Sequence, residues 1–491
     1  MPASFKKKTA RVLLVESNNM NKWVGTTMPY EMHVPPLGLM YLASYARTAL
    51  PEIEFRIVES SLSCPDDERF IRILQEFQPD VVGVRSIVFF LEELQRIAAL
   101  VRAHSDATLI TGGPIVKAYK KRLFEEVPEV DIAVKGEGEQ VFVNLLTEGS
   151  PVSVAGVLYR TSDGVVENED QREIADIDSI PFPAYDLIDL DEYQRQLSYA
   201  YNHRRQGVLL TSRGCVYHCT YCFSHWKRTR LRSAANIFAE ISELYTRHGI
   251  QDLYVVDDIF NVNVKRSLDL FDMILAAGLK LRLYFVNGLR ADLATEEFVD
   301  RALEAGAVWF TYAVESATEE IQSLVQKGLD LNKAKRIITY TQRQNVAVNI
   351  STMYGFPTET REMAQRTLDW LGELPKPSLL PYHFCLRFFP GCAINEQALE
   401  AGWDAERLGF TSRFSYNDMP MSTPTLSKQD MYSIQLEYHR RFGMNNPAAV
   451  DGAIGTLSSI GYSDTEILHM YSVLKRKVFH HVSDLVTTGG N

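Results

Sequence analysis

Short apolar segments alternate with amphipathic segments along most of the chain, and this alternation limits the fold more than any other feature of the sequence. Before residue 150 the apolar segments are short and largely β-branched, as expected for strands buried on both faces of a parallel sheet. They are Val12–Glu16, Phe55–Val58, Val81–Arg85, Thr108–Thr111 and Ile132–Val134. We predict an α/β fold that begins with a doubly wound sheet, where ligands normally bind at the carboxyl ends of the strands.

The alternation resumes with a longer period from residue 205 to about 390. Six strands are expected there: Val208–Ser212, Leu253–Val256, Leu283–Val286, Trp309–Val314, Val348–Tyr354 and Pro381–Phe388. The intervening helices are expected at Ala234–His248, Val264–Ala277, Glu296–Ala305, Lys333–Gln344 and Thr360–Leu374. Six such units predict an open, partial (β/α)6 barrel, whose catalytic residues gather at the carboxyl ends of its strands.

Four regions follow from these patterns. Residues 1–150 form the doubly wound domain, and residues 151–204 form a hairpin and a proline-punctuated linker. Residues 205–394 form the partial barrel, and residues 395–491 form a helical C-terminal domain. The clearest helices of that last region are expected at Met431–Phe442 and Ile467–Phe479.

Three cysteines follow the first barrel strand directly. Cys215, Cys219 and Cys222 are spaced C-x3-C-x2-C. Thiolates at these intervals can bind three irons of a [4Fe–4S] cluster, which leaves the fourth iron open to another ligand. A structural zinc site is the alternative, with His218 or His225 as the fourth ligand of a closed shell.

The motif resembles the signature CxxxCxΦC of the radical S-adenosylmethionine (SAM) enzymes, with Tyr221 as its aromatic residue. The resemblance implies a [4Fe–4S] cluster whose open iron chelates SAM, with Tyr221 near the adenine. Downstream stretches similar to the family's DDxF, R-x-D, ES and GxPxET segments supply further candidates for cofactor contacts and for the base. These residues are Asp257, Asp258, Asn287, Arg290, Glu315, Ser316 and Gly355. The alternative for two of them is a mutual ion pair of Glu315 with Arg290, and the turn departs from the family's P-G-E-T by having Thr358.

The N-terminal domain resembles the cobalamin-binding-type domain of one large radical SAM class. The similar stretches are Pro35–Ala46, Thr111–Pro114 and Lys135–Glu139. The usual cobalt-ligand motif, D-x-H-x-x-G, is absent, and His33 lies in E-M-H-V-P-P without the required Asp or Gly. We therefore predict a domain of this type that is free of cobalamin, with a loop role for His33.

Three functions are compatible with this architecture: a cobalamin-dependent radical SAM methyltransferase, a radical SAM 1,2-diol dehydratase, and a non-catalytic cluster protein that transfers electrons. The chain resembles the diol dehydratases of aminoglycoside biosynthesis in its domain layout, in its cysteine loop and in the missing cobalt-ligand motif. This resemblance implies C3′ deoxygenation of a substrate such as paromamine. Asp257 or Asp258 would act as the base. Tyr217, between the first two cysteines, would give a hydrogen atom to the product radical, and its alternative role is packing. Cys385 and Cys392 are further hydrogen donors or buried thiols.

Composition limits the partners and the compartment. The net charge of −11 argues against nucleic acid and is compatible with a cationic small substrate. No apolar run reaches the ~18 residues of a membrane span, and six cysteines, three in one motif, favour a reducing cytoplasm. We expect a flavodoxin-type electron donor, and a nicotinamide-dependent reductase would act on the ketone product.

Overall fold

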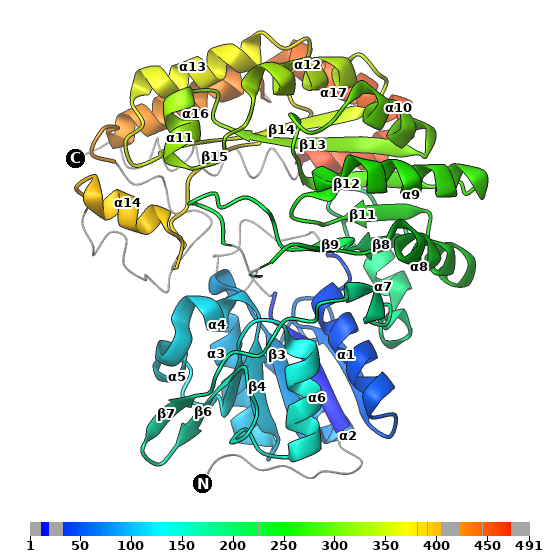
Figure 1. Ribbon diagram of the computed structural model, residues 1–491, viewed down its shortest axis with the longest axis vertical. Coiled ribbons are helices and arrows are strands. Elements are labelled where there is room, and N and C mark those ends of the chain that lie inside the picture. The colour runs from blue at the N-terminus through cyan, green and yellow to red at the C-terminus, as the bar shows by residue number, and fades with distance from the viewer. Residues whose placement is uncertain are drawn as a thin grey trace. The chain divides into compact units, whose positions relative to one another are not determined.

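The computed structural model describes residues 11–18, 33–223, 226, 228–380, 382–389, 391–403, 423–443 and 445–472. These residues belong to two compact units, which meet in the chain between Glu192 and Tyr193 (Figure 1). Each unit is built around one sheet, as the strand–helix alternation predicts. No described helix is long and apolar enough to cross a membrane.

The first unit contains a seven-stranded sheet in the order β2-β1-β3-β4-β5-β6-β7. Its strands are β1 (Arg11–Glu16), β2 (Glu54–Glu59), β3 (Val81–Arg85), β4 (Thr108–Gly112), β5 (Ile132–Val134), β6 (Val157–Thr161) and β7 (Gly164–Glu167). The first five pair in parallel, which confirms the doubly wound sheet. The predicted hairpin, β6 and β7, pairs antiparallel with β5, so the unit runs on to Glu192 instead of ending near residue 150.

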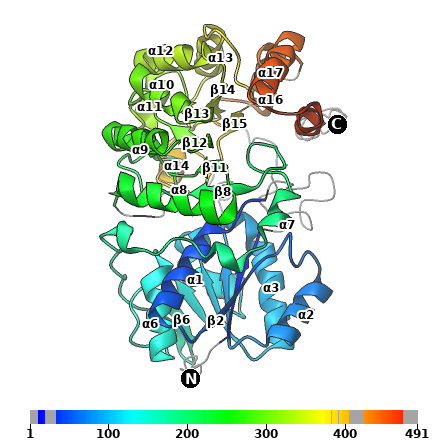
Figure 2. The same cartoon turned by 90° about the vertical axis from the view of Figure 1, so that its right-hand side faces the viewer.

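Helices cover both faces of this sheet, α1 and α6 on one face and α2 and α3 on the other (Figure 2). The longer ones are α1 (Leu37–Ala49), α2 (Asp67–Phe77), α3 (Leu91–His104) and α6 (Gly138–Glu148). Shorter helices are α4 (Pro114–Tyr119), α5 (Leu123–Glu126) and α7 (Leu190–Gln194), with single 3-10 turns at η1 (Val88–Phe90), η2 (Lys120–Arg122), η3 (Ile177–Ser179) and η4 (Tyr185–Leu187). Leu94, Ile97 and Val101 are fully buried, because the apolar face of α3 packs on the sheet.

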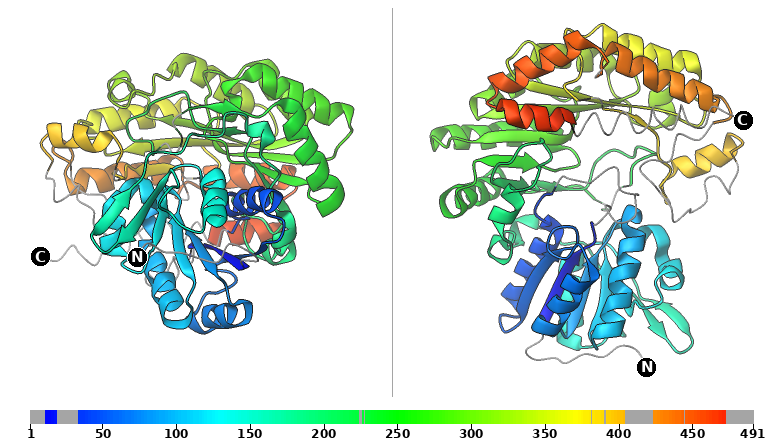
Figure 3. Two further views of the ribbon diagram at one scale, coloured as in Figure 1. Left: turned by 60° about the horizontal axis from the view of Figure 1, so that its bottom comes forward. Right: turned by 180° about the vertical axis from the view of Figure 1, so that it is seen from behind.

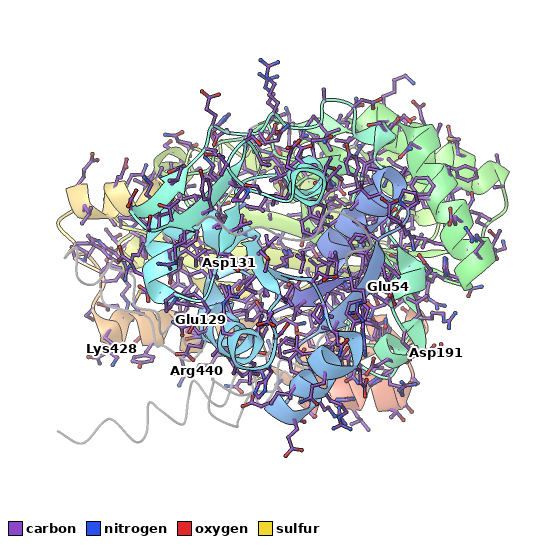
Figure 4. The ribbon with its side chains drawn as sticks, turned by 90° about the horizontal axis from the view of Figure 1, so that it is seen from below. Glu54, Glu129, Asp131, Asp191, Lys428 and Arg440 are labelled. Carbon is purple, nitrogen blue, oxygen red and sulfur yellow. The ribbon has the colours of Figure 1, made fainter. Side chains whose placement is uncertain are left out.

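The amino-terminal edge of this sheet carries charges that serve the fold. Figure 4 shows Glu54, Glu129 and Asp131 on that side. Asp131 pairs with Arg102 and accepts a 2.8 Å hydrogen bond from the backbone N–H of Leu109. These bonds fasten the start of β5 to α3 and β4, and they leave the opposite, carboxyl-terminal edge as the place for a ligand.

The second unit contains a six-stranded parallel sheet in the order β15-β14-β13-β12-β11-β8, the expected partial barrel. Its strands are β8 (Gln206–Leu209), β11 (Asp252–Val255), β12 (Arg282–Leu289), β13 (Ala307–Glu315), β14 (Ala347–Tyr354) and β15 (His383–Cys385). The first strand is shorter than predicted, because Ser212 and Arg213 (β9) leave the sheet and pair antiparallel with Arg230 and Leu231 (β10).

Helices line the outside of this sheet over an aromatic core made by Phe271, Phe285, Phe298 and Phe310. They are α8 (Ala234–His248), α9 (Val264–Ala276), α10 (Glu296–Glu304), α11 (Glu319–Leu324), α12 (Leu331–Gln342) and α13 (Arg361–Gly372), with a 3-10 turn η5 (Phe260–Val262). The predicted C-terminal helices belong to the same unit: α14 (Ile394–Glu400), α16 (Lys428–Arg441) and α17 (Pro447–Ser459). Helix α16 packs against α13 (Figure 3), and the part of Ile467–Phe479 beyond residue 472 lies outside the described residues.

Candidate functional site

A glycine turn sends the chain from β9 into the cysteine loop. Gly214 has φ +84°, and a Cβ at this position would collide with the carbonyl oxygen of Arg228. Only glycine tolerates both constraints, because it has no Cβ and adopts positive φ readily. The turn therefore brings Cys215 directly beyond the β9–β10 pair.

The three cysteines of the loop are free thiols. Cys215 and Cys219 are half-buried and Cys222 is exposed. Although part of the Cys222 side chain reaches the surface, the protein packed around its sulfur and the negative charges of Asp258 and the other two cysteines raise the pKa of its thiol to about 12. The three sulfurs thus lie within electrostatic reach of one another.

The described residues contain no group of three His, Cys, Asp or Glu side chains converging on one metal ion. A structural zinc ion gathers four ligands around one centre. A [4Fe–4S] cluster does not require such convergence, because each thiolate binds a different iron. His218 is exposed, and His225 lies outside the described residues.

Hydrogen bonds fasten the middle of the loop to two other segments. The Thr220 N–H donates to the carbonyl oxygen of Val325 at 3.0 Å, and the Thr220 carbonyl accepts from the Ile394 N–H at 2.9 Å. The Thr220 hydroxyl donates to Oε1 of Gln397 at 3.0 Å. The loop is therefore held between the segment after α11 and the start of α14.

Tyr221 and Glu315 meet at a buried lysine that the sequence analysis did not single out. Nζ of Lys327 lies 3.1 Å from Oε1 of Glu315 and 3.3 Å from the Tyr221 hydroxyl. Glu315 ends β13 with φ +67°, a left-handed conformation that is costly for a residue with a Cβ. Burial and the charge of Glu315 raise the pKa of Tyr221 well above its usual value.

Arg290 holds Tyr217. Its guanidinium carbon lies 3.8 Å from the centre of the Tyr217 ring, a cation–π contact. The same guanidinium binds both carboxylate oxygens of Asp292, at 2.9 and 2.7 Å, and the carbonyl oxygens of Lys327 and Gly328. The ion pair of Arg290 with Glu315 considered from the sequence does not form, because each residue has another partner of opposite charge.

The two aspartates after β11 differ in their surroundings. Asp257 is buried and accepts hydrogen bonds from the Thr211 N–H at 2.6 Å and from the Thr211 and Ser212 hydroxyls at 2.5 Å. These bonds tie the end of β11 to the chain that leaves β8, which is a structural task. Asp258 is exposed, its pKa is raised by the surrounding protein and by Asp257, and its charge reaches Cys215 and Cys222. Of the two, Asp258 is the one whose side chain is exposed.

The remaining candidates lie at the carboxyl ends of neighbouring strands. Asn287 is exposed and donates to the carbonyl oxygens of Val256 and Asp257, at 2.8 and 3.3 Å. Ser316 is fully buried, and its hydroxyl lies 3.0 Å from that of Thr318. These two side chains are already engaged with the protein.

Gly355 turns the chain after β14. Its φ is +85°, its N–H donates to the buried Glu359 at 2.5 Å, and a Cβ would lie 2.6 Å from the Met431 side chain. Burial raises the pKa of Glu359 to about 8. Thr358, where the family has glycine, is exposed and is not among the residues of positive φ, so the departure from the motif does not strain the turn.

A second polar site lies at the carboxyl ends of β1, β2 and β3 in the first unit, where its strand order reverses direction. Oε1 of the buried Glu16 pairs with Nη1 of Arg85 at 2.5 Å, and Oε2 of Glu16 has no hydrogen-bond partner among the described residues. Gly113 has φ +90°, and a Cβ there would lie 2.7 Å from the Ser86 carbonyl oxygen.

His33 is buried beside the same strand ends. Its Nδ1 lies 2.6 Å from Oε1 of Glu59, the last residue of β2.

Comparisons with known proteins agree with this division into two units. Residues 209–371 match the radical SAM superfamily, and residues 23–146 match the B12 binding domain. The chain is 29% identical over 379 residues to an uncharacterised methyltransferase of Pyrococcus horikoshii, a match that covers 75% of this chain and 79% of the relative. It is 26% identical over 349 residues to the cytidylyl-2-hydroxyethylphosphonate methyltransferase of Streptomyces wedmorensis, covering 62% and 64% of the two chains.

A solved structure shares the fold over nearly the whole chain. It is the radical SAM methyltransferase TsrM of Kitasatospora setae with cobalamin and a [4Fe–4S] cluster bound, at a TM-score of 0.67 and 19% identity. The match covers 96% of this chain and 99% of that chain. Both units therefore follow an architecture known from a protein that holds both cofactors.

Proposed function

We propose that this radical SAM enzyme, which joins a radical SAM region to a B12-binding region in one chain, is a cobalamin-dependent methyltransferase acting on a small molecule. The proposal rests on two features found in one chain. One is the loop with Cys215, Cys219 and Cys222, and the other is the polar site at the carboxyl ends of β1, β2 and β3 in the unit that matches the B12 binding domain. The named function of the relatives supports the same chemistry, because the two described above are methyltransferases.

The expectation of a cobalamin-free N-terminal domain is thereby corrected. It rested on the missing D-x-H-x-x-G motif, whereas residues 23–146 match the B12 binding domain. The fit is supported by the buried, unpaired Oε2 of Glu16, which can accept a hydrogen bond from an amide group of the corrin ring. Gly112 and Gly113 would let the cofactor approach the backbone closely. Bound cobalamin would supply the methyl carrier.

In the second unit the cysteines would hold three irons of the cluster, and the open iron would bind SAM, which supplies the radical. The overall reaction uses two molecules of SAM, one substrate C–H group and two electrons. It gives the methylated product, S-adenosylhomocysteine, 5′-deoxyadenosine and methionine. This balance releases no net proton, so Asp258 would act as a base only in the dehydration considered next. Arg290 and Asp292 would keep Tyr217 in place, and a flavodoxin-type donor is the expected source of electrons.

Radical dehydration of a 1,2-diol is a second candidate that one observation favours. Tyr217 is fixed between two cluster cysteines by the Arg290 contact, where its phenol could give a hydrogen atom to a product radical. The aminoglycoside substrate predicted from the sequence has no support from the comparisons, and neither does the paired nicotinamide-dependent reductase.

The products of SAM separate the two candidates. Methyl transfer leaves S-adenosylhomocysteine as well as 5′-deoxyadenosine, whereas dehydration leaves 5′-deoxyadenosine and methionine alone. We expect anaerobically reconstituted protein with cobalamin and a reductant to form S-adenosylhomocysteine. Cys219→Ala, the matched control for cluster chemistry, should form no 5′-deoxyadenosine. Protein that retains a full cluster but yields only 5′-deoxyadenosine would favour the dehydratase.

A further inference from the structure

Lys327 contacts one tyrosine of the cysteine loop and the arginine that covers the other. Its ammonium group contacts Glu315 and the Tyr221 hydroxyl, at 3.1 and 3.3 Å. Its carbonyl oxygen accepts a 2.8 Å hydrogen bond from Nη1 of Arg290, the residue whose guanidinium covers Tyr217. Tyr221 is therefore held by Lys327 directly, and Tyr217 is linked to it through Arg290.

The burial of this lysine requires an explanation. Lys327 is 6% exposed and Glu315 is 7% exposed. A buried ion pair adds little net stability, since removing two charges from water offsets most of their attraction. Glu315 also holds an unfavourable backbone conformation at an irregularity of the sheet, where the pairing of β13 with β14 shifts between Ala313 and Glu315. Buried charges and backbone strain at the carboxyl end of a barrel strand are typical of a functional site.

We propose that Lys327 is a positioning residue, which fixes Tyr221 and Glu315 relative to each other so that SAM meets the open iron in one orientation. The inference rests on the proposed radical SAM function and adds a residue to it. The side chain would act through Glu315 and Tyr221, while its backbone carbonyl steadies Arg290 in any variant.

The test measures SAM affinity for each reconstituted cluster, by titrating the reduced [4Fe–4S] protein and following its electron paramagnetic resonance spectrum. We expect Lys327→Met to raise the dissociation constant by about tenfold or more, the size of effect seen when a group coupled to its neighbours is removed. Lys327→Arg keeps the charge and should stay within about threefold of wild type. Lys333→Met is the matched control, because Lys333 is an exposed lysine of α12.

A double variant separates positioning from simple loss of stability. Residues that act as one unit give non-additive losses, so Lys327→Met combined with Glu315→Gln should bind SAM about as weakly as the worse single variant. Multiplied losses would contradict the proposal. So would Lys327→Met protein with a full cluster and a dissociation constant within about twofold of wild type.

Tyr221→Phe keeps the test decisive if the lysine variants fold poorly. It removes only the hydroxyl that Lys327 contacts, and it should weaken SAM binding both in wild type and in the Lys327→Arg background, where the arginine rebuilds that contact. SAM affinity unchanged by Tyr221→Phe in both backgrounds would overturn the proposal. Failure of the wild-type protein to bind SAM at all would instead overturn the proposed function.

Discussion

The side chains of the cysteine loop take their positions from the barrel. Tyr221 is placed by Lys327, Tyr217 by Arg290 and Thr220 by Val325 and Ile394. A reactive radical must be generated at a fixed distance from its target, and groups held by neighbouring side chains keep such distances better than a free loop does. The buried Asp257 serves the same purpose by joining the end of β11 to the chain that leaves β8.

Replacing Tyr217 by Phe separates its packing role from its chemical role. The ring and its contact with Arg290 remain, and only the phenolic O–H is lost. If the enzyme transfers methyl groups, 5′-deoxyadenosine and S-adenosylhomocysteine formation should stay within about threefold of wild type. Turnover that stalls after formation of 5′-deoxyadenosine would show that the phenol donates hydrogen, as the dehydratase hypothesis requires.

Glu359 should make the stability of the protein depend on pH. Its folded-state pKa of about 8 lies above the ordinary value of 4.5, so the folded protein keeps a proton there that the unfolded chain releases. This contribution lowers stability as pH rises from about 4.5 to 8, by at most about 1.4 kcal/mol per pH unit. Glu359→Gln cannot ionise and resembles the protonated form. Its melting temperature should therefore gain on wild type between pH 5 and 8; parallel melting curves would contradict the assignment.

At the scale of elements, the site depends on how strands end. Polar residues follow β11, β12, β13 and β14 at one edge of the barrel sheet, and β9 and β10 place the cysteine loop. The turn at Gly214 leaves no room for a side chain, because the backbone of Arg228 occupies the position that a Cβ would take.

Gly214→Ala should therefore displace the loop and reduce the iron bound after reconstitution. Gly249→Ala is the matched control: Gly249 ends α8 with a similar positive φ of 65°, but nothing lies within 4 Å of its Cβ position. The control should cost about 1 kcal/mol of stability and retain its iron. Equal iron content in the two variants would show that the turn does not set the loop.

At the scale of the whole molecule, the alternation of apolar and amphipathic segments predicts the strands and helices of both sheets, because the spacing of apolar residues can be read within each short segment. Helix α8 begins and ends where the pattern predicts. The hairpin at 157–167 was assigned outside the first domain, since its pairing with β5 depends on a distant edge strand. Lys327 was missed for the same reason: a lone lysine before a glycine has no periodic signal, and its partners are 12 and 106 residues away.

The match of residues 23–146 to the B12 binding domain argues against the predicted absence of cobalamin, which rested on one short missing motif. The corrin can be held by backbone, glycines and amide contacts along the sheet edge, none of which requires a histidine at a fixed spacing. The unpaired Oε2 of Glu16 and the glycines after β4 are the features of this chain that fit such a ligand.

One measurement tests the central claim most directly: the cobalt content of anaerobically purified and reconstituted protein, determined together with the S-adenosylhomocysteine it forms from SAM under reducing conditions. A cobalamin-dependent methyltransferase should retain stoichiometric cobalamin with a corrin absorption spectrum and release S-adenosylhomocysteine. Cys219→Ala should keep the cobalt, because the proposed sites of the two cofactors belong to different units, yet form no 5′-deoxyadenosine. Protein with a full cluster, no retained cobalt and no S-adenosylhomocysteine would contradict the account.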